Sequence, residues 1–134
     1  MKQPKQNAER WLREAEYTFR LGEKLHTEKA YSYACFLAEQ TAQKALKAVL
    51  YFDGARLITM HSIAKLLEEI GRKRPEFLLF KADGGRLDQY YLSTRYPDAV
   101  AEPAIPSEIF VEDQSREALD IARKIFDASK TLIG

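Results

Sequence analysis

The order of hydrophobic and polar residues along the chain predicts a series of amphipathic helices. In the N-terminal part, small and apolar residues recur at intervals of three and four, which places them on one face of an α-helix. These residues are Ala8, Trp11, Leu12, Ala15, Phe19, Gly22 and Leu25. Asn7 directly precedes this face, and asparagine is a common acceptor for the unpaired N–H groups at a helix start. We therefore expect a first helix from about Ala8 to His26 with Asn7 as its N-cap.

A second and longer helix is expected from Ala30 to Phe52. This stretch contains neither glycine nor proline, is rich in alanine and aromatic residues, and is followed by Asp53-Gly54, where the helix should end. Four alanines at intervals of three or four form a stripe that lets a neighbouring helix approach closely. They are Ala34, Ala38, Ala42 and Ala45. Such a helix belongs at the centre of a bundle, with Cys35 as a core residue and not a nucleophile.

Two further helices are predicted in the middle of the chain. In the first, four apolar residues have helical spacing: Ile63, Leu66, Leu67 and Ile70. This helix should end at Gly71, before a basic segment, residues 72–74, that we expect to be a solvated loop. A second helix is expected from Phe77 to Tyr91. Because each glycine costs about 1 kcal/mol of helix preference relative to alanine, it should be broken or kinked at Gly84-Gly85.

The C-terminal third contains an irregular connection and one more long helix. Ser93 to Pro106 holds three prolines, so it is expected to be an extended connection that is not helical throughout. Apolar spacing predicts a last helix from about Glu112 to Leu132. No alternating β-strand pattern and no internal repeat competes with these helices. The 134 residues therefore predict one all-α domain, residues 1–134, folded as an antiparallel up-and-down bundle of four to five helices.

Charge and cysteine content narrow the class of protein. The chain has 21 Lys and Arg against 20 Asp and Glu, a formal net charge of +1, so any contact with nucleic acid must come from a local patch. The single cysteine excludes an intramolecular disulfide and a multi-cysteine metal site, which is typical of a reducing compartment. No signal-peptide pattern and no apolar run near the ~20 residues of a membrane span is present. We therefore expect a cytoplasmic protein that does not cross a membrane.

Three segments of the chain carry a resemblance to a known family. Residues 90–98, Tyr-Tyr-Leu-Ser-Thr-Arg-Tyr-Pro-Asp, form a tyrosine-rich arginine-tyrosine-proline-aspartate motif. Residues 36–48 form a polar and alanine-rich helix pattern, and residues 60–63, Met-His-Ser-Ile, open the next helix. Together they resemble a prokaryotic branch of the HEPN family, whose name abbreviates higher eukaryotes and prokaryotes nucleotide-binding. The resemblance spans most of the chain.

Membership in this family would imply a compact antiparallel bundle of four or five helices that is often dimeric. It would also imply nucleotide chemistry, since many members pair with a small nucleotidyltransferase in toxin–antitoxin systems and others are metal-independent ribonucleases. We therefore expect a nucleotide- or phosphate-binding interaction module without a cofactor. Its expected partners are a second copy of the chain, a small nucleotidyltransferase, and nucleotide or RNA. The alternatives are a ribonuclease toxin that acts on RNA, and a structural scaffold that only binds the nucleotidyltransferase.

The ribonuclease alternative meets one departure from the family pattern. The ribonuclease members resemble one another in an arginine that is followed, after four to six residues, by a histidine. Near Arg95 the places for this histidine are taken by residues 100–102, Val-Ala-Glu, so the catalytic pair is incomplete. Arg56 and His61 match the spacing as a bare string, but they lie in the loop that leads to the third helix, where helix entry is the competing interpretation.

A polar strip on the second helix is the first candidate binding feature. Gln40, Gln43, Lys44 and Lys47 lie at intervals of three and four and therefore share one face. Two ammonium groups and two amides on one face suit a phosphate. A solvated helix face, or a polar strip buried against the arginine-containing segment, would have the same spacing.

The arginine-containing segment is the second candidate. Arg95 is flanked by Tyr91 and Tyr96 and followed by Pro97-Asp98, so its guanidinium suits a phosphate or carboxylate while a tyrosine stacks on a base. In the competing interpretation Arg95 pairs with Asp98 or another carboxylate, and the tyrosines close the end of the bundle.

The two histidines complete the set of candidates. His61 is a possible base, ligand or hydrogen-bonding group at a helix start, whereas His26 is expected at the surface without a role. Two histidines and one cysteine do not make a metal site of ordinary spacing. The expected ligand-binding groove is thus lined by Gln40, Lys44, Lys47, His61, Tyr91, Arg95, Tyr96 and Asp98. Arg95, His61 and Arg56 are the only candidates for catalysis.

Overall fold

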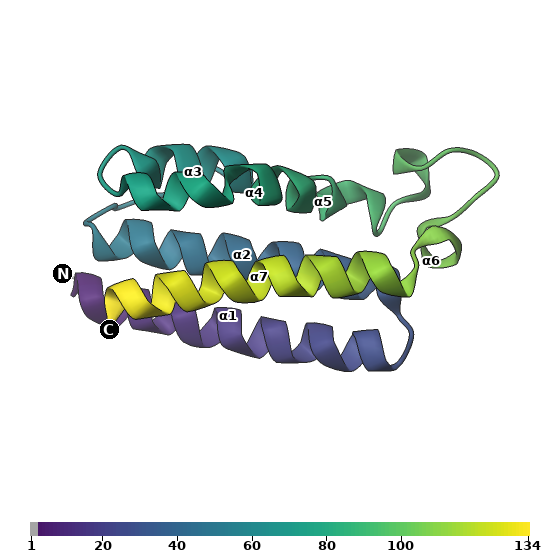
Figure 1. The fold of residues 1–134 in the computed structure, drawn as a ribbon, viewed down its shortest axis with the longest axis horizontal. Coiled ribbons are helices and arrows are strands. Elements are labelled where there is room, and N and C mark those ends of the chain that lie inside the picture. The colour runs from purple at the N-terminus through teal and green to yellow at the C-terminus, as the bar shows by residue number, and fades with distance from the viewer. Residues whose placement is uncertain (1–2) are drawn as a thin grey trace.

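The computed structural model describes residues 3–134, and every regular element in this range is helical. Five helices in it have eight residues or more: α1 (Pro4–Thr27), α2 (Tyr31–Phe52), α3 (Ile63–Gly71), α4 (Lys81–Asp88) and α7 (Glu112–Ile133). The long helices α1, α2 and α7 run side by side along the long axis of the molecule, and α3 and α4 pack beside them (Figure 1). The predicted all-α bundle is confirmed. None of the helices in the described range is long and apolar enough to span a membrane.

The first helix begins earlier than its hydrophobic pattern suggests. It starts at Pro4, with Gln3 as the N-cap residue, because proline fits the first helical position, where its missing N–H group is not needed. Asn7 lies inside the helix and is buried, so the prediction that it caps the helix is wrong. At the other end the chain reverses through Lys29, which has a φ of 64°, and α2 returns antiparallel to α1.

Helix α2 occupies the centre of the bundle. It contacts α1, α7, α3 and α4, and its four-alanine stripe is completely buried. Small side chains allow neighbouring helix backbones to approach closely, and larger residues such as Leu46 and Val49, also completely buried, fill the remaining space. The predicted central helix and its small-residue stripe are therefore confirmed. Cys35 is fully buried in the same core, and this burial raises the pKa of its thiol to about 12.

The predicted helix break at Gly84-Gly85 is wrong, because both glycines lie within α4. The α-helix is instead interrupted at its two ends, where the 3₁₀ helix η1 (Pro75–Phe80) precedes α4 and where Gln89 separates α4 from α5. Gly84 is buried against α3: a Cβ atom there would lie 2.8 Å from side-chain atoms of Ile63 and Leu67. The close approach of α3 and α4 therefore requires glycine at this position and outweighs its poor helix preference.

The segment after α4 carries two very short helices, α5 (Tyr90–Ser93) and α6 (Pro106–Ile109), joined by an irregular connection. A 3₁₀ turn, η2 (Pro97–Ala99), interrupts this connection, as is common where proline fixes φ. The prediction that Ser93 to Pro106 is not helical throughout is confirmed. Helix α7 then returns along α2 and α1.

Candidate functional site

Five of the eight predicted ligand-binding residues line one depression in the surface, with a volume of about 240 Å³. They come from three separate parts of the chain, which are α2, the loop before α3, and α5. They are Gln40, Lys44, Lys47, His61 and Tyr91. Trp11 from α1 and Gln43 from α2 complete the wall. We refer to this depression as the Lys47 site.

The Lys47 ammonium group is the most buried cation of this site. The residue is 9% exposed, and its Nζ lies 3.5 Å from Nδ1 of His61 and 5.9 Å from the centre of the Trp11 ring. No ion pair within the described chain involves Lys47, whereas Lys44 has Glu14 at 3.6 Å and donates a hydrogen bond to Thr18. Burial lowers the pKa of Lys47, and the negative charge of Glu39 counteracts this shift. Lys47 therefore lacks a carboxylate partner at ion-pair distance.

A buried carboxylate, Glu39, underlies the polar strip of α2. It is completely buried, and it accepts hydrogen bonds from the side-chain amides of Gln40, at 2.8 Å, and Gln43. Burial raises its pKa to about 7, although both hydrogen bonds act in the opposite direction. The two glutamines thus use amide donors to satisfy Glu39. Glu39 is not among the site residues predicted from the sequence, although its position four after Cys35 and three before Ala42 places it on the buried face of the helix.

His61 is held in place from the start of α3. Ser62 caps this helix by accepting the Lys65 N–H, and the Asp88 carboxylate accepts hydrogen bonds from the Ser62 hydroxyl and from the backbone of Ile63. Ser62, and not His61, is therefore the capping residue. The exposed His61 ring lies parallel to the Tyr91 ring, at a centroid distance of 6.3 Å and an interplanar angle of 9°.

Arg95 lies beside the Lys47 site but does not line it. Its guanidinium donates hydrogen bonds of 3.1 and 2.6 Å to the backbone oxygen of Tyr91. It also lies over the Phe36 ring, 4.1 Å from the centroid, and over the Tyr96 ring at 4.9 Å. Asp98 is exposed, and no ion pair in residues 3–134 involves it. Arg95 thus joins α5 to α2 through Phe36, and not through a pair with Asp98.

The structure does not bring Arg56 and His61 into one depression. Arg56 is exposed and lines a neighbouring hollow with Tyr51, on another side of Trp11. His61 lines the Lys47 site instead. An arginine–histidine pair acting on one phosphate needs both side chains at the same atoms, and these two line different hollows.

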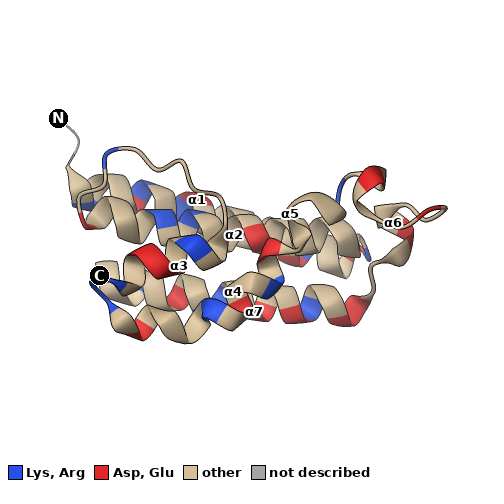
Figure 2. Ribbon diagram, turned by 90° about the horizontal axis from the view of Figure 1, so that it is seen from above, with Lys and Arg blue, Asp and Glu red and all other residues tan. Residues whose placement is uncertain are grey.

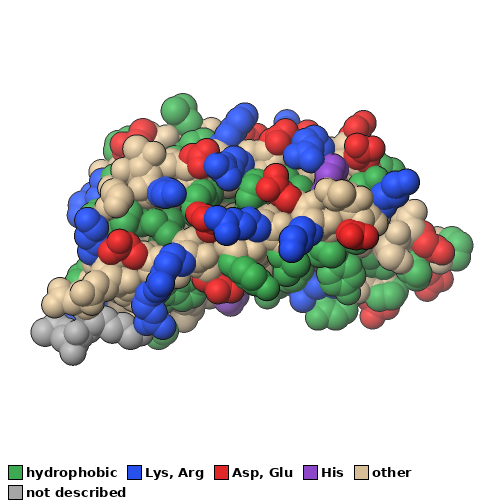
Figure 3. All heavy atoms as spheres, turned by 90° about the horizontal axis from the view of Figure 1, so that it is seen from below, with side chains coloured by type: hydrophobic (Ala, Val, Ile, Leu, Met, Phe, Trp, Pro, Cys, Tyr) green, Lys and Arg blue, Asp and Glu red, His purple; other side chains and the backbone are tan. Residues whose placement is uncertain are grey.

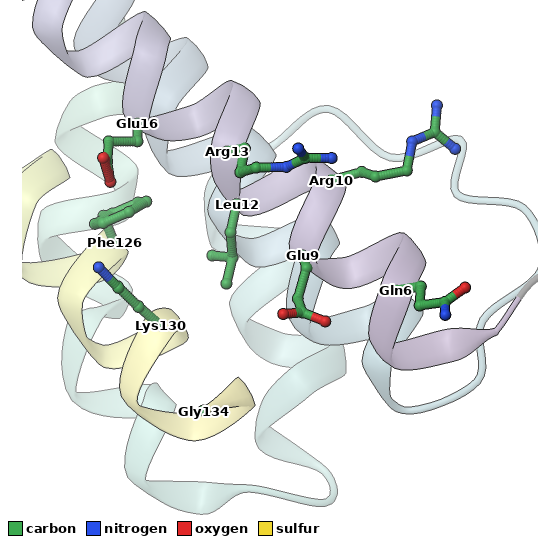
Figure 4. Close-up of a pocket in the computed structure, with 9 residues that line it drawn as sticks. All are labelled: Gln6, Glu9, Arg10, Leu12, Arg13, Glu16, Phe126, Lys130 and Gly134. Carbon is green, nitrogen blue, oxygen red and sulfur yellow. The ribbon is translucent and has the colours of Figure 1, made fainter.

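The remaining candidates lie elsewhere. His26, expected at the surface without a role, is half-buried, and its Nδ1 is hydrogen-bonded to the Ser115 hydroxyl. No group of three or more His, Cys, Asp or Glu side chains in the described range is arranged to hold a metal ion. A larger hollow, of about 570 Å³, lies between α1 and α7 (Figure 4). Its lining holds two acidic residues, Glu9 and Glu16, and three basic residues, Arg10, Arg13 and Lys130.

The helical bundle is that of a HEPN domain. The family model described as HEPN domain matches residues 8–132, and the chain belongs to this family, whose domains are nucleotide-binding or ribonuclease-type modules that commonly dimerise. The resemblance of the three sequence segments to the HEPN family is therefore confirmed at the level of the family.

Two solved structures share this fold along nearly their whole length. TT1696 from Thermus thermophilus is 32% identical, with a TM-score of 0.84 over 92% of this chain and 96% of that chain. ST0689, an archaeal HEPN homologue, is 31% identical, with a TM-score of 0.75 over 100% of both chains. A search of curated proteins found no match.

Proposed function

We propose that this HEPN domain is a nucleotide- or phosphate-binding interaction module, and that the ligand phosphate binds beside Lys47 and His61. The observation that carries this proposal is the buried Lys47 ammonium group. The Lys47 residue is 9% exposed, and in the described chain no carboxylate lies within ion-pair distance of its Nζ. A buried charge without a counter-charge is unfavourable. An anion bound in this depression would therefore pair with the Lys47 ammonium group and stabilise it.

The walls of the Lys47 site suit a nucleotide in other respects. Lys44 adds a second ammonium group, and Tyr91 and Trp11 present aromatic rings at its edge. Aromatic rings next to cations are the usual surface on which unpaired bases stack. A volume of about 240 Å³ lies below the range of ligand pockets that enclose a whole drug-sized molecule. The site therefore suits a phosphate and its sugar, with the base at the rim.

The other predicted binding residues, Arg95, Tyr96 and Asp98, follow Tyr91 along the chain and form the outer part of the proposed site. Arg95 already uses two of its five N–H donors on the Tyr91 oxygen, and it does not line the depression. We therefore assign the main electrostatic contribution to Lys47, and a smaller one to Arg95.

Calorimetric titration with AMP, ATP and inorganic phosphate tests the site. Lys47→Met keeps the apolar stem but removes the charge, and it should weaken nucleotide affinity by about tenfold or more, whereas Lys47→Arg should retain most of it. Lys124→Ala removes an exposed charge from α7 and serves as the matched control. Thermal melting of each variant verifies that it is folded. Equal affinity in the wild type and in folded Lys47→Met would overturn the proposal.

The partners form the second part of the proposal, namely a homodimer that binds a small nucleotidyltransferase. The helical core leaves large hydrophobic side chains exposed on α1 and α2, among them Tyr17 at 62% and Tyr33 at 48%. Figure 3, which views the molecule from below, shows hydrophobic side chains gathered along its lower right edge. Exposed apolar patches of this kind favour protein contacts. Sedimentation of the purified chain tests the dimer, and affinity purification from the native host tests the nucleotidyltransferase.

The alternative, a metal-independent ribonuclease toxin, has weaker support because Arg56 and His61 line separate hollows. Incubation of the purified protein with single-stranded RNA distinguishes the two functions. Cleavage that is lost in both His61→Ala and Arg95→Ala would favour the ribonuclease, and intact RNA would favour the binding module.

A further inference from the structure

We propose that a single-stranded nucleic acid, longer than one nucleotide, binds across the surface centred on Trp11. This inference rests on the proposed function for one of its three parts, the Lys47 site, and extends that site over α1 and the loop after α2. Of the tyrosine-rich segment, only Tyr91 lines the proposed surface, and Arg95 does not.

Three adjoining hollows share Trp11 as a wall. The first, of about 710 Å³, lies over α1 and contains Arg10 and Arg13. The second, of about 600 Å³, contains Tyr51 and Arg56. The third is the Lys47 site. We call these three hollows together the Trp11 surface. Because Trp11 borders all three hollows, they lie next to one another on the surface.

The charge of this surface differs from that of the chain as a whole. Its lining holds five basic residues and one acidic residue, Glu14, while the net charge of the chain is only +1. The basic residues are Arg10, Arg13, Lys44, Lys47 and Arg56. Within the described chain, Lys44 is the only one of them in an ion pair. Four positive side chains therefore remain available for successive phosphates of a polyanion.

The directions of the arginines support one continuous basic surface. Figure 4 shows the Arg10 and Arg13 side chains extending from α1 to the side away from Phe126 and Lys130. Both residues border the hollow between α1 and α7 as well as the first hollow of the Trp11 surface. Figure 2 shows basic positions on the half of α1 nearest the N-terminus and on the adjoining loop. The arginines thus contribute to the Trp11 surface on the side where α2 supplies its lysines.

Aromatic rings between these cations favour a single strand over other polyanions. The Trp11 and Tyr51 rings lie 5.4 Å apart at an interplanar angle of 32°, and Lys47 lies over the Trp11 ring. Cations alternating with aromatic rings are typical of sites that hold a phosphate backbone while bases stack on the rings. The stacked bases of a duplex do not offer their faces to such rings.

The chain contains a single tryptophan, so its fluorescence reports on this surface directly. Titration with UMP and with oligouridylates of about three and about eight nucleotides should give saturable quenching, with affinity that rises at least tenfold from UMP to the longest strand. Oligonucleotide affinity should fall steeply with salt, by about 0.7 log units per phosphate contact for each log unit of salt.

A double variant, Arg10→Ala with Arg13→Ala, should lower the affinity for the longest strand at least fivefold, and more than it lowers the affinity for UMP. Lys124→Ala, which removes a charge from α7, is the matched control and should bind as the wild type does. Trp11→Phe, followed with an end-labelled strand by fluorescence anisotropy, should bind more weakly without unfolding, because phenylalanine keeps most of the packing.

Each outcome separates this inference from the proposed function. UMP binding without any gain for longer strands would overturn the Trp11 surface and leave the Lys47 site intact. Strand binding that depends on Arg10 and Arg13, in a protein that does not bind UMP, would support the Trp11 surface and count against the nucleotide site. Equal strand affinity in the double variant, or binding to vesicles of anionic lipid in place of the strand, would overturn the inference.

Discussion

Arg74 binds the carboxylate of Asp53 through two hydrogen bonds, 3.0 Å from Nε to Oδ2 and 2.7 Å from Nη2 to Oδ1. Asp53 follows the last residue of α2, and Arg74 follows α3, so this pair ties the two helix ends together. The Arg74 side chain is 21% exposed and the Asp53 side chain is 14% exposed. The expectation that residues 72–74 form a solvated loop is therefore wrong for Arg74, although Lys73 is 67% exposed.

Arg74→Ala should lower the free energy of unfolding by about 1–3 kcal/mol, because it leaves a half-buried carboxylate without its bidentate partner. Lys73→Ala removes a more exposed charge near the same carboxylate and should cost less than about 0.5 kcal/mol. Urea denaturation measures both. The hydrogen bonds from Arg74 hold the pKa of Asp53 below 3.8, so this stabilisation is present above that pH and is lost as the pH falls further. Equal effects of the two variants would contradict this assignment.

The two neighbouring glycines of α4 should respond in opposite ways to alanine. Gly84→Ala would place its Cβ 2.8 Å from atoms of Ile63 and Leu67, and the separation of α3 from α4 should cost about 1–3 kcal/mol of stability. At Gly85 nothing lies within 4 Å of the added atom, and Gly85→Ala should stabilise the protein by roughly 0.5–1 kcal/mol through better helix preference. Thermal melting of both variants checks this, and a stabilising Gly84→Ala would disprove the close contact.

The buried Glu39 should make stability depend on pH in a defined window. Its pKa rises from 4.5 to about 7 on folding, so between these values the folded protein holds a proton that the unfolded chain has released. Stability should therefore fall as the pH rises from about 4.5 to about 7, by up to about 3 kcal/mol, and change little above that. Glu39→Gln removes the titration and should flatten the curve. Urea denaturation across this range, with the exposed Glu23→Gln as control, measures the effect, and an unchanged slope in Glu39→Gln would contradict it.

Hydrophobic periodicity predicted the helices because it reports which residues face the core. The span of α2, its buried alanines and the common face of Gln40, Lys44 and Lys47 all follow from a period of 3.6 residues. The same pattern does not reveal contacts between distant segments. The burial of Gly84 against Ile63 depends on how α3 and α4 pack, and this packing overrides the low helix preference of glycine.

The candidate site was predictable only in part, because periodicity does not reveal contacts between side chains. Spacing within α2 does not predict that Gln40 and Gln43 donate to Glu39, because their use depends on what else is buried beside them. The position of Arg95 over Phe36 depends on a contact between residues 59 positions apart. The sequence suggests more directly that Arg95 pairs with a carboxylate such as Asp98. Contact with an aromatic ring is an alternative that the sequence does not reveal.

Asp88 should affect ligand binding although it does not line the Lys47 site. Its carboxylate accepts hydrogen bonds from the N–H groups of Ile63, at 2.6 Å, and Ala64, at 3.1 Å, and from the Ser62 hydroxyl at 2.8 Å. A negative charge at the N-terminus of α3 stabilises this helix and holds the loop that carries His61.

Asp88→Ala should therefore lower the free energy of unfolding by about 1–2 kcal/mol and also weaken nucleotide affinity, because His61 is no longer held opposite Lys47. Asp88→Asn keeps one acceptor oxygen and should have smaller effects on both quantities. Asp120→Ala removes an exposed carboxylate from α7 and should change each by less than about 0.5 kcal/mol. Urea denaturation and calorimetric titration measure the two effects separately. If Asp88→Ala destabilises the fold but binds nucleotide as tightly as the wild type, then the start of α3 supports the bundle without positioning His61 for the ligand.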